Sequence, residues 1–139
     1  MSQQVETVQR PVRRGVNVAL WVVQVLLAAA FVMSGGGKLA GTERMVELFD
    51  TIGVGQWFRY VVGALEIAGA VGLLVPRLAG LAALGLTGVM AGAAVTEVAI
   101  GGMPVPALIL AILAAVVAWG RRRDIRRDAL AVLRRDIRA

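Results

Sequence analysis

Four apolar stretches, separated by short polar segments, make up most of the chain. They cover residues 16–36, 57–75, 78–100 and 103–119. A helix needs roughly 20 apolar residues to cross about 30 Å of hydrocarbon, which is close to the length of each stretch. A soluble helix bundle would carry charged residues on its outer face at every third or fourth position, but residues 78–96 contain no charge. The pattern therefore predicts an all-α, integral membrane four-helix bundle over residues 16–119.

The first stretch also has two features of a secretory signal peptide. Arginines precede it, and small residues lie near its centre, at positions 28–30. The apolar region of a signal peptide is only about 7–15 residues long, however, and this stretch is longer. We therefore expect a retained first helix, preceded by a cytoplasmic arm at residues 1–15.

Two polar segments are too regular or too apolar to be simple loops. Residues 120–139 alternate basic and apolar residues, and the apolar ones recur at helical spacing. We expect an amphipathic helix on the membrane surface there; a solvated tail and a partner-docking helix are the alternatives. The first connection, residues 39–56, is predicted to contain a short interfacial helix over residues 43–51, capped by Thr42.

Basic residues are distributed unevenly across the predicted membrane. Three arginines in the N-terminal arm, one after the second stretch and eight in the tail fall on one side, against Lys38, Arg44 and Arg59 on the other. Because short cytoplasmic segments are enriched in Lys and Arg, both termini are predicted to be cytoplasmic. The net charge of +6 is then explained by orientation and by contact with membrane lipids, and no nucleic-acid partner is expected.

The chain contains no cysteine and no histidine. This composition excludes thiol redox exchange, Cys/His zinc sites, bis-histidine haem and any catalytic triad or dyad that needs His. No metal site is predicted. The candidate functional residues are therefore the few polar groups inside the apolar stretches.

Glu66 is the clearest of these groups, because it lies nine residues from each end of the second stretch. Ionisable residues inside a membrane span are costly and indicate function. Arg59 and Gly63 share its helical face, and Arg59 is two turns away, about 10 Å along the axis. We expect Arg59, Glu66 and Lys38 to line one cavity that opens outward.

The first stretch carries a matching polar face. Asn17, Gln24, Phe31 and Lys38 recur every seven residues. Gln24 lies near mid-depth, where an amide needs a partner, and a hydrogen bond to Glu66 is predicted. Lys38 lies at the outer end, where it can pair with Glu43, Glu66 or Glu97 or extend to the interface. Glu97 can also face water.

Small residues recur along the third stretch, at Gly85, Gly88 and Gly92. Such a pattern allows helices to approach closely. We expect these glycines, together with Gly63 on the second stretch, to pack inside the bundle; the alternative is a homodimer contact.

Two motifs resemble those of DoxX-like proteins. Residues 31–39, Phe-Val-Met-Ser-Gly-Gly-Gly-Lys-Leu, resemble the end of that family's first helix, where a small-residue pair precedes Lys-Leu. Residues 63–76, Gly-Ala-Leu-Glu-Ile-Ala-Gly-Ala-Val-Gly-Leu-Leu-Val-Pro, are similar to its second-helix signature. The resemblance covers residues 19–119, and the order and spacing of the two motifs make it specific.

The resemblance implies a bacterial plasma-membrane protein in which Lys38 and Glu66 are the family's lysine and glutamate. The family is named for a small membrane subunit associated with a thiosulfate:quinone oxidoreductase. Relatives are linked to oxidative-stress defence and to receptor assembly. Because the chain lacks Cys and His, electron transfer would have to use a bound quinone or the cofactor of a protein partner.

Three functions are consistent with these observations. The first is an accessory subunit of a membrane oxidoreductase complex, not catalytic on its own, with a cavity that contacts quinone. The second is an assembly or structural factor, in which Gln24–Glu66 and Lys38–Glu97 contacts hold the helices together. The third is a small proton-coupled transporter that acts as a dimer. The sequence identifies neither a substrate nor a partner.

Overall fold

The computed structural model describes residues 2–138, except for the side chains of residues 2–13, 124 and 128. It contains six helices and, over the described residues, no strand. They are α1 (Ser2–Ala40), α2 (Glu43–Ile52), α3 (Gln56–Leu74), α4 (Ala79–Ala99), α5 (Val105–Gly120) and α6 (Arg122–Arg138). Helix α1 is continuous from Ser2, so most of the predicted arm at residues 1–15 is helical.

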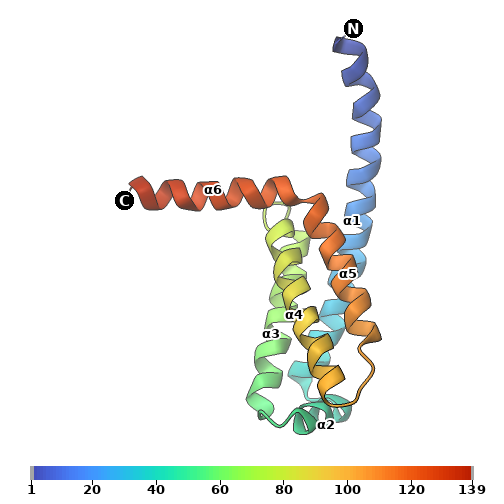
Figure 1. Ribbon diagram of the computed structural model, residues 1–139, viewed down its shortest axis with the longest axis vertical. Coiled ribbons are helices and arrows are strands. Elements are labelled where there is room, and N and C mark those ends of the chain that lie inside the picture. Colours follow the sequence, from blue (N-terminus) through green and yellow to red (C-terminus); the bar gives the residue numbers. More distant parts are fainter. Residues whose placement is uncertain (1, 139) are drawn as a thin grey trace.

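Helices α1, α3, α4 and α5 form an antiparallel bundle (Figure 1). The closest pairs are α1 with α3 and α4 with α5, and α3 packs beside α4. The core between them is apolar and fully buried, with Phe31, Leu73, Leu86 and Val117 among its largest side chains. The N-terminal part of α1 and all of α6 leave the bundle at the same end, whereas α2 lies at the opposite end (Figure 1).

Among the described residues, three helices are long and apolar enough to span a membrane. They comprise residues 14–40 of α1, α3 and α4. Helix α5 has 16 residues, which is shorter than the roughly 20 that a span needs. It reaches that length only together with α6, from which it is bent by 66°. The prediction of four apolar helices is therefore confirmed, whereas the length criterion alone identifies three spans, or four if the bent pair counts as one.

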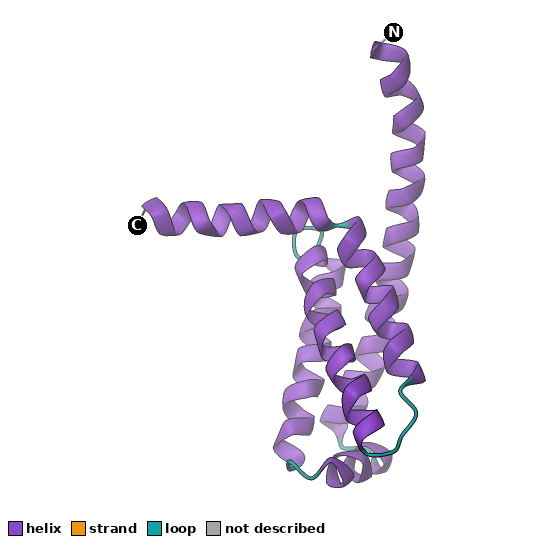
Figure 2. Cartoon of the chain, viewed as in Figure 1, coloured by secondary structure: helices purple, strands orange, loops and turns teal. Residues whose placement is uncertain are grey.

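Helix α2 closes the end of the bundle away from the termini (Figure 2), as the apolar first connection predicted. Thr42 is the N-cap residue, but its side chain makes no capping hydrogen bond. Two glycines make the turn into α3, with φ of 81° at Gly53 and 114° at Gly55. Residues other than glycine rarely adopt such angles, so this turn depends on both.

Helix α6 projects sideways from the other end of the bundle (Figure 2). Its first turn is anchored on α4: a Cβ atom added to Gly80 would lie 2.7 Å from Ile125. Beyond that turn its apolar side chains are uncovered, with Leu130, Leu133 and Ile137 all exposed. The predicted tail helix is confirmed, and its exposed apolar residues are those expected to enter a membrane surface.

Candidate functional site

One face of α1 supplies polar groups to two separate clusters. Gln24 and Phe31 on this face are 0% exposed and Lys38 is 8% exposed. Phe31 lies between the two polar residues along the helix, so it separates the clusters with an aromatic ring. We call the cluster around Lys38 and Glu66 the outer cluster, because it lies toward the end of the bundle that carries α2. We call the cluster around Gln24 and Arg121, at the end where α6 leaves the bundle, the inner cluster.

The outer cluster depends on a close crossing of α1 and α3 at two glycines. A Cβ atom added to Gly35 would lie 2.8 Å from the carbonyl oxygen of Gly63. One added to Gly63 would lie 3.0 Å from Cβ of Lys38. Real Cβ atoms do not tolerate the first distance, so only glycine fits at position 35 without a shift of the backbone. The crossing brings the lysine on α1 opposite the glutamate on α3.

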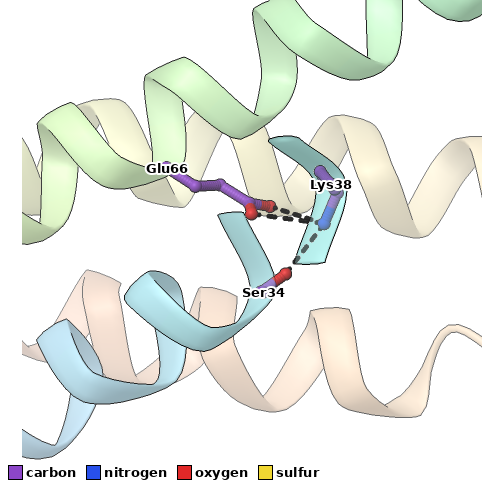
Figure 3. A network of polar contacts seen from close by, with 3 residues as sticks. All are labelled: Ser34, Lys38 and Glu66. Carbon is purple, nitrogen blue, oxygen red and sulfur yellow. Dashed lines mark hydrogen bonds and ion pairs between the residues drawn. The ribbon is translucent and has the colours of Figure 1, made fainter. Parts of the chain in front are cut away.

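Lys38 and Glu66 form a buried ion pair between these helices (Figure 3). The lysine Nζ lies 3.2 Å from both carboxylate oxygens and donates a hydrogen bond to Oε2. It also donates to Oγ of Ser34, one turn earlier on α1, at 2.8 Å. Glu66 is 1% exposed. Each buried charge therefore has an opposite charge beside it, as buried ions require.

Arg59 extends the outer cluster to the end of α1. Its Nη1 donates a hydrogen bond to the carbonyl oxygen of Lys38 in the last turn of α1, which also accepts one from the backbone N–H of Gly41. Its Nε donates to Oε1 of Gln56 at 2.8 Å. The amide of Gln56 in turn donates to Val46 and Asp50 of α2. Arg59 is 4% exposed and joins α1 to α3, while Gln56 joins α3 to α2.

The inner cluster joins α1, α3 and the end of α5. Nε2 of Gln24 donates a hydrogen bond to the carbonyl oxygen of Leu73, in the last turn of α3, at 2.8 Å. Its Oε1 accepts from Nε of Arg121 at 3.0 Å. Nη1 of Arg121 donates to Oδ1 of Asn17 at 2.8 Å. The remaining nitrogen, Nη2, is buried and has no hydrogen-bond partner.

Several contacts predicted from the sequence are replaced by others. The predicted Gln24–Glu66 hydrogen bond is wrong, because the two residues belong to different clusters. Of the three acids considered for Lys38, the partner is Glu66. Glu97 is half-buried near the end of α4 and lies outside both clusters. Lys38, Arg59 and Glu66 do come together, but they bond to one another, and they line neither the pocket at the α5–α6 junction nor the groove between α3 and α4.

The predicted glycine packing holds at one position and fails at three. Gly63 lies in the α1–α3 crossing. Around Gly85, Gly88 and Gly92, by contrast, an added Cβ atom would meet nothing within 4 Å. These three glycines leave a smooth strip on the outward face of α4, whereas other residues, such as Ala83, Leu86 and Met90, form the core face of that helix.

A groove of 360 Å³ opens between α3 and α4, beside this strip. Its wall is formed only by apolar residues: Leu65, Ala68, Gly69, Gly72, Leu78, Leu81, Ala82, Gly85, Leu86 and Val89. The groove can hold a hydrocarbon chain. Its side chains offer no hydrogen bond to a polar head group.

Three residues of the clusters, Ser34, Gln56 and Arg121, were missed at the level of sequence. Ser34 precedes Lys38 by four residues, a spacing that places two side chains on the same face of a helix, so it could have been found. Arg121 was counted only as an orientation charge. The missing partners of Asn17 and Gln24 were the available signal, but no local pattern connects them to a residue about a hundred positions away.

Long apolar helices, an apolar core and ionisable groups paired in the interior define a polytopic α-helical membrane protein. The sequence profile of the DoxX-like family matches residues 22–120, which include both clusters except Asn17 and Arg121. The chain belongs to the DoxX-like family. Neither a curated protein sequence nor a solved structure gives a significant match to the chain.

Proposed function

We propose that this protein is an accessory subunit of a bacterial membrane oxidoreductase complex and that it catalyses no reaction alone. The observation that carries the proposal is the outer cluster. Lys38 and Glu66 pair with each other, and Arg59 bonds the end of α1 to the start of α3. They therefore position helices and leave no free acid or base for a substrate. The link to an oxidoreductase comes from the DoxX-like family, which is named for a subunit associated with such an enzyme.

The outer cluster argues against a proton-coupled transporter. Such a transporter needs a carboxylate that exchanges protons with water on alternate sides of the membrane. Glu66 is 1% exposed and lies 3.2 Å from the lysine Nζ. A carboxylate held in this way is suited to joining α1 and α3.

The surface of α4 supports an association with another membrane protein. The strip at Gly85, Gly88 and Gly92 allows a helix backbone to approach closely, which drives helix association in membranes. In our proposal a helix of the partner subunit packs there, and a second copy of this chain is the alternative. The α3–α4 groove beside it would hold the tail of a quinone, and the partner would supply the polar ligands of the quinone head group.

In the same proposal the protein lies in the plasma membrane with both termini in the cytoplasm. The end of the bundle from which α1 and α6 emerge carries Arg77 and the arginines of α6. Short segments rich in arginine remain on the cytoplasmic side. A cysteine introduced at position 47 should react with an impermeant reagent in intact cells, whereas one at position 130 should react only after permeabilisation.

Purification of the tagged protein from native membranes tests the proposed association. We expect a redox protein with its cofactors, together with quinone, to be retained in mild detergent. Gly88→Leu should release the partner, whereas Ala115→Leu on the exposed face of α5 should not. A partner recovered without its cofactors would favour the assembly factor instead. Recovery of the chain alone, without quinone, would contradict the proposal.

A further inference from the structure

The inner cluster borders a second pocket at the end of the bundle where α5 turns into α6. This pocket has a volume of 410 Å³ and is lined by Val16, Asn17, Leu20, Gly120, Arg121, Arg122 and Arg123. Its size falls within the roughly 300–1,000 Å³ of typical small-ligand sites. Three consecutive arginines on one wall and apolar side chains of α1 on another give it a charged part and an apolar part.

Arg121 is a cation whose charge is not balanced within the described part of the protein. Its guanidinium is held by two neutral amides, of Gln24 and Asn17. Among the described side chains, the ion pair that forms is between Lys38 and Glu66, far from this position. Nη2 of Arg121 is buried and unbonded. An arginine side chain carries a permanent positive charge. An anion placed in the pocket would therefore balance this charge and would also accept a hydrogen bond from Nη2.

The surroundings of the pocket place it at the membrane–water interface. The guanidinium carbon of Arg121 lies 5.7 Å from the ring centroid of Trp21, and that of Arg122 lies 4.6 Å from the ring of Trp119. Tryptophan side chains concentrate at the level of lipid head groups. The apolar side chains of α6, which leaves the bundle at this end, are also exposed. The anion that is most concentrated at this depth is the phosphate of a lipid.

We infer that the pocket between α1 and the α5–α6 junction binds the phosphate of an anionic phospholipid. The phosphate would lie against Arg121 and Arg123, and an acyl chain would extend along the apolar side chains of Val16 and Leu20. Arg122 contributes less, since its Nη1 already donates to the carbonyl oxygen of Trp119 at 3.0 Å. Basic pockets between helices on the cytoplasmic side commonly bind acidic head groups. This inference is independent of the proposed oxidoreductase partner.

Native mass spectrometry of the delipidated full-length protein tests the inference. The protein is titrated separately with phosphatidylglycerol, with phosphatidylcholine and with inorganic phosphate. We expect one tightly bound phosphatidylglycerol and a rise in Tm on binding it. Phosphatidylcholine, which carries the same phosphodiester without net charge, should bind more weakly. Inorganic phosphate should neither bind nor raise the Tm, because it cannot use the apolar wall.

The decisive variant is Arg123→Gln, because Arg123 is exposed and its loss does not disturb the helix contacts. It should weaken phosphatidylglycerol binding by about tenfold, the equivalent of one charge-assisted hydrogen bond. Arg135→Gln removes the same charge from α6 outside the pocket and should leave binding unchanged. Equal weakening by both variants, equal binding of the two lipids, or a matching response to inorganic phosphate would overturn the inference.

Arg121→Gln tests the buried nitrogen directly, and its folding is checked by the Tm of the lipid-free protein. A folded variant that retains full phosphatidylglycerol binding would contradict the assigned role of Arg121. If the variant does not fold, the comparison of Arg123→Gln with Arg135→Gln still decides the inference.

Discussion

The outer and inner clusters use the same face of α1 but balance their charges differently. In the outer cluster, the cation of Lys38 meets the anion of Glu66 at 3.2 Å. In the inner cluster, the hydrogen bonds of Arg121 go to two neutral amides, and no described side chain places an anion beside it. The outer pair lies beside the middle of α3, where no external ion can reach it. Arg121 lies where the bundle ends, and an ion from outside can complete it.

The difference shows how depth determines what a polar residue can do in this fold. A charge surrounded by apolar helices must be compensated by the protein itself, because the cost of leaving it alone is several kcal/mol. A charge at the interface can be left open for a lipid or a partner. The outer cluster is therefore expected to contribute most to the free energy of unfolding. The inner cluster is expected to bind a lipid at the membrane surface.

The largest effect is expected from breaking the buried ion pair. Replacing either Lys38 or Glu66 with Met leaves the other charge unpaired and should lower the free energy of unfolding by about 3–5 kcal/mol. Replacing both with Met should restore stability to near the native value, since apolar residues often substitute for a buried pair without loss. Thermal unfolding of all four proteins in detergent measures the cycle. A double variant as unstable as the two single variants would contradict a purely pairwise role.

A smaller effect is expected from the inner cluster. Gln24→Leu leaves Nε of Arg121 and the carbonyl oxygen of Leu73 without their partners. We expect a total loss of about 1–3 kcal/mol, because Arg121 is only half-buried and water can replace its lost partner. Asn17→Ala removes one exposed contact of the same arginine and should cost less. Chemical denaturation of the two variants in detergent compares them. An inner cluster as costly to break as the outer ion pair would remove the distinction between them.

The α1–α3 crossing should respond differently at two adjacent glycines. Gly35→Ala places a Cβ atom 2.8 Å from a backbone oxygen. Overpacking of this kind should destabilise the protein by about 1–3 kcal/mol, and the higher helix propensity of alanine offsets part of that loss. Gly36→Ala meets nothing within 4 Å and should stabilise it by up to about 1 kcal/mol. The two Tm values, measured in parallel, should move in opposite directions. Equal shifts would mean that the crossing is not tight.

The smallest of these effects is expected at Arg59. Arg59→Lys keeps the charge, but a lysine lacks the guanidinium fork. It therefore cannot donate to Gln56 and to the carbonyl oxygen of Lys38 at the same time. We expect a loss of about 0.5–1.5 kcal/mol. Arg44→Lys, on the exposed face of α2, should stay within about 0.5 kcal/mol of the native protein. The difference in Tm between the two variants is the measurement.

The sequence was sufficient for the helices, because their apolar runs and the glycine turn at Gly53 are local signals. It was also sufficient to single out Lys38, Arg59 and Glu66, since ionisable residues stand out in apolar surroundings. It did not reveal which polar groups meet. Gln24 could be matched with Glu66 by depth alone, but the depth of a residue does not determine which neighbouring helix it faces.

The glycines illustrate the same limit. Gly63 and Gly88 were both expected from the sequence to pack inside the bundle. Only the packing of α1 on α3 buries the first, and only the rotation of α4 leaves the second exposed. Periodicity identifies a face, whereas the arrangement of the other helices decides whether that face is inside.

In the function proposed above, Lys38 and Glu66 position helices and take no part in chemistry. The direct test is the Lys38→Met, Glu66→Met double variant, expressed in place of the native protein in its own membrane. The Tm of the variant verifies its folding. We expect the folded variant to retain its protein partner and to support native levels of quinone-linked activity in that membrane. A double variant that folds and keeps its partner but loses the activity would contradict the claim.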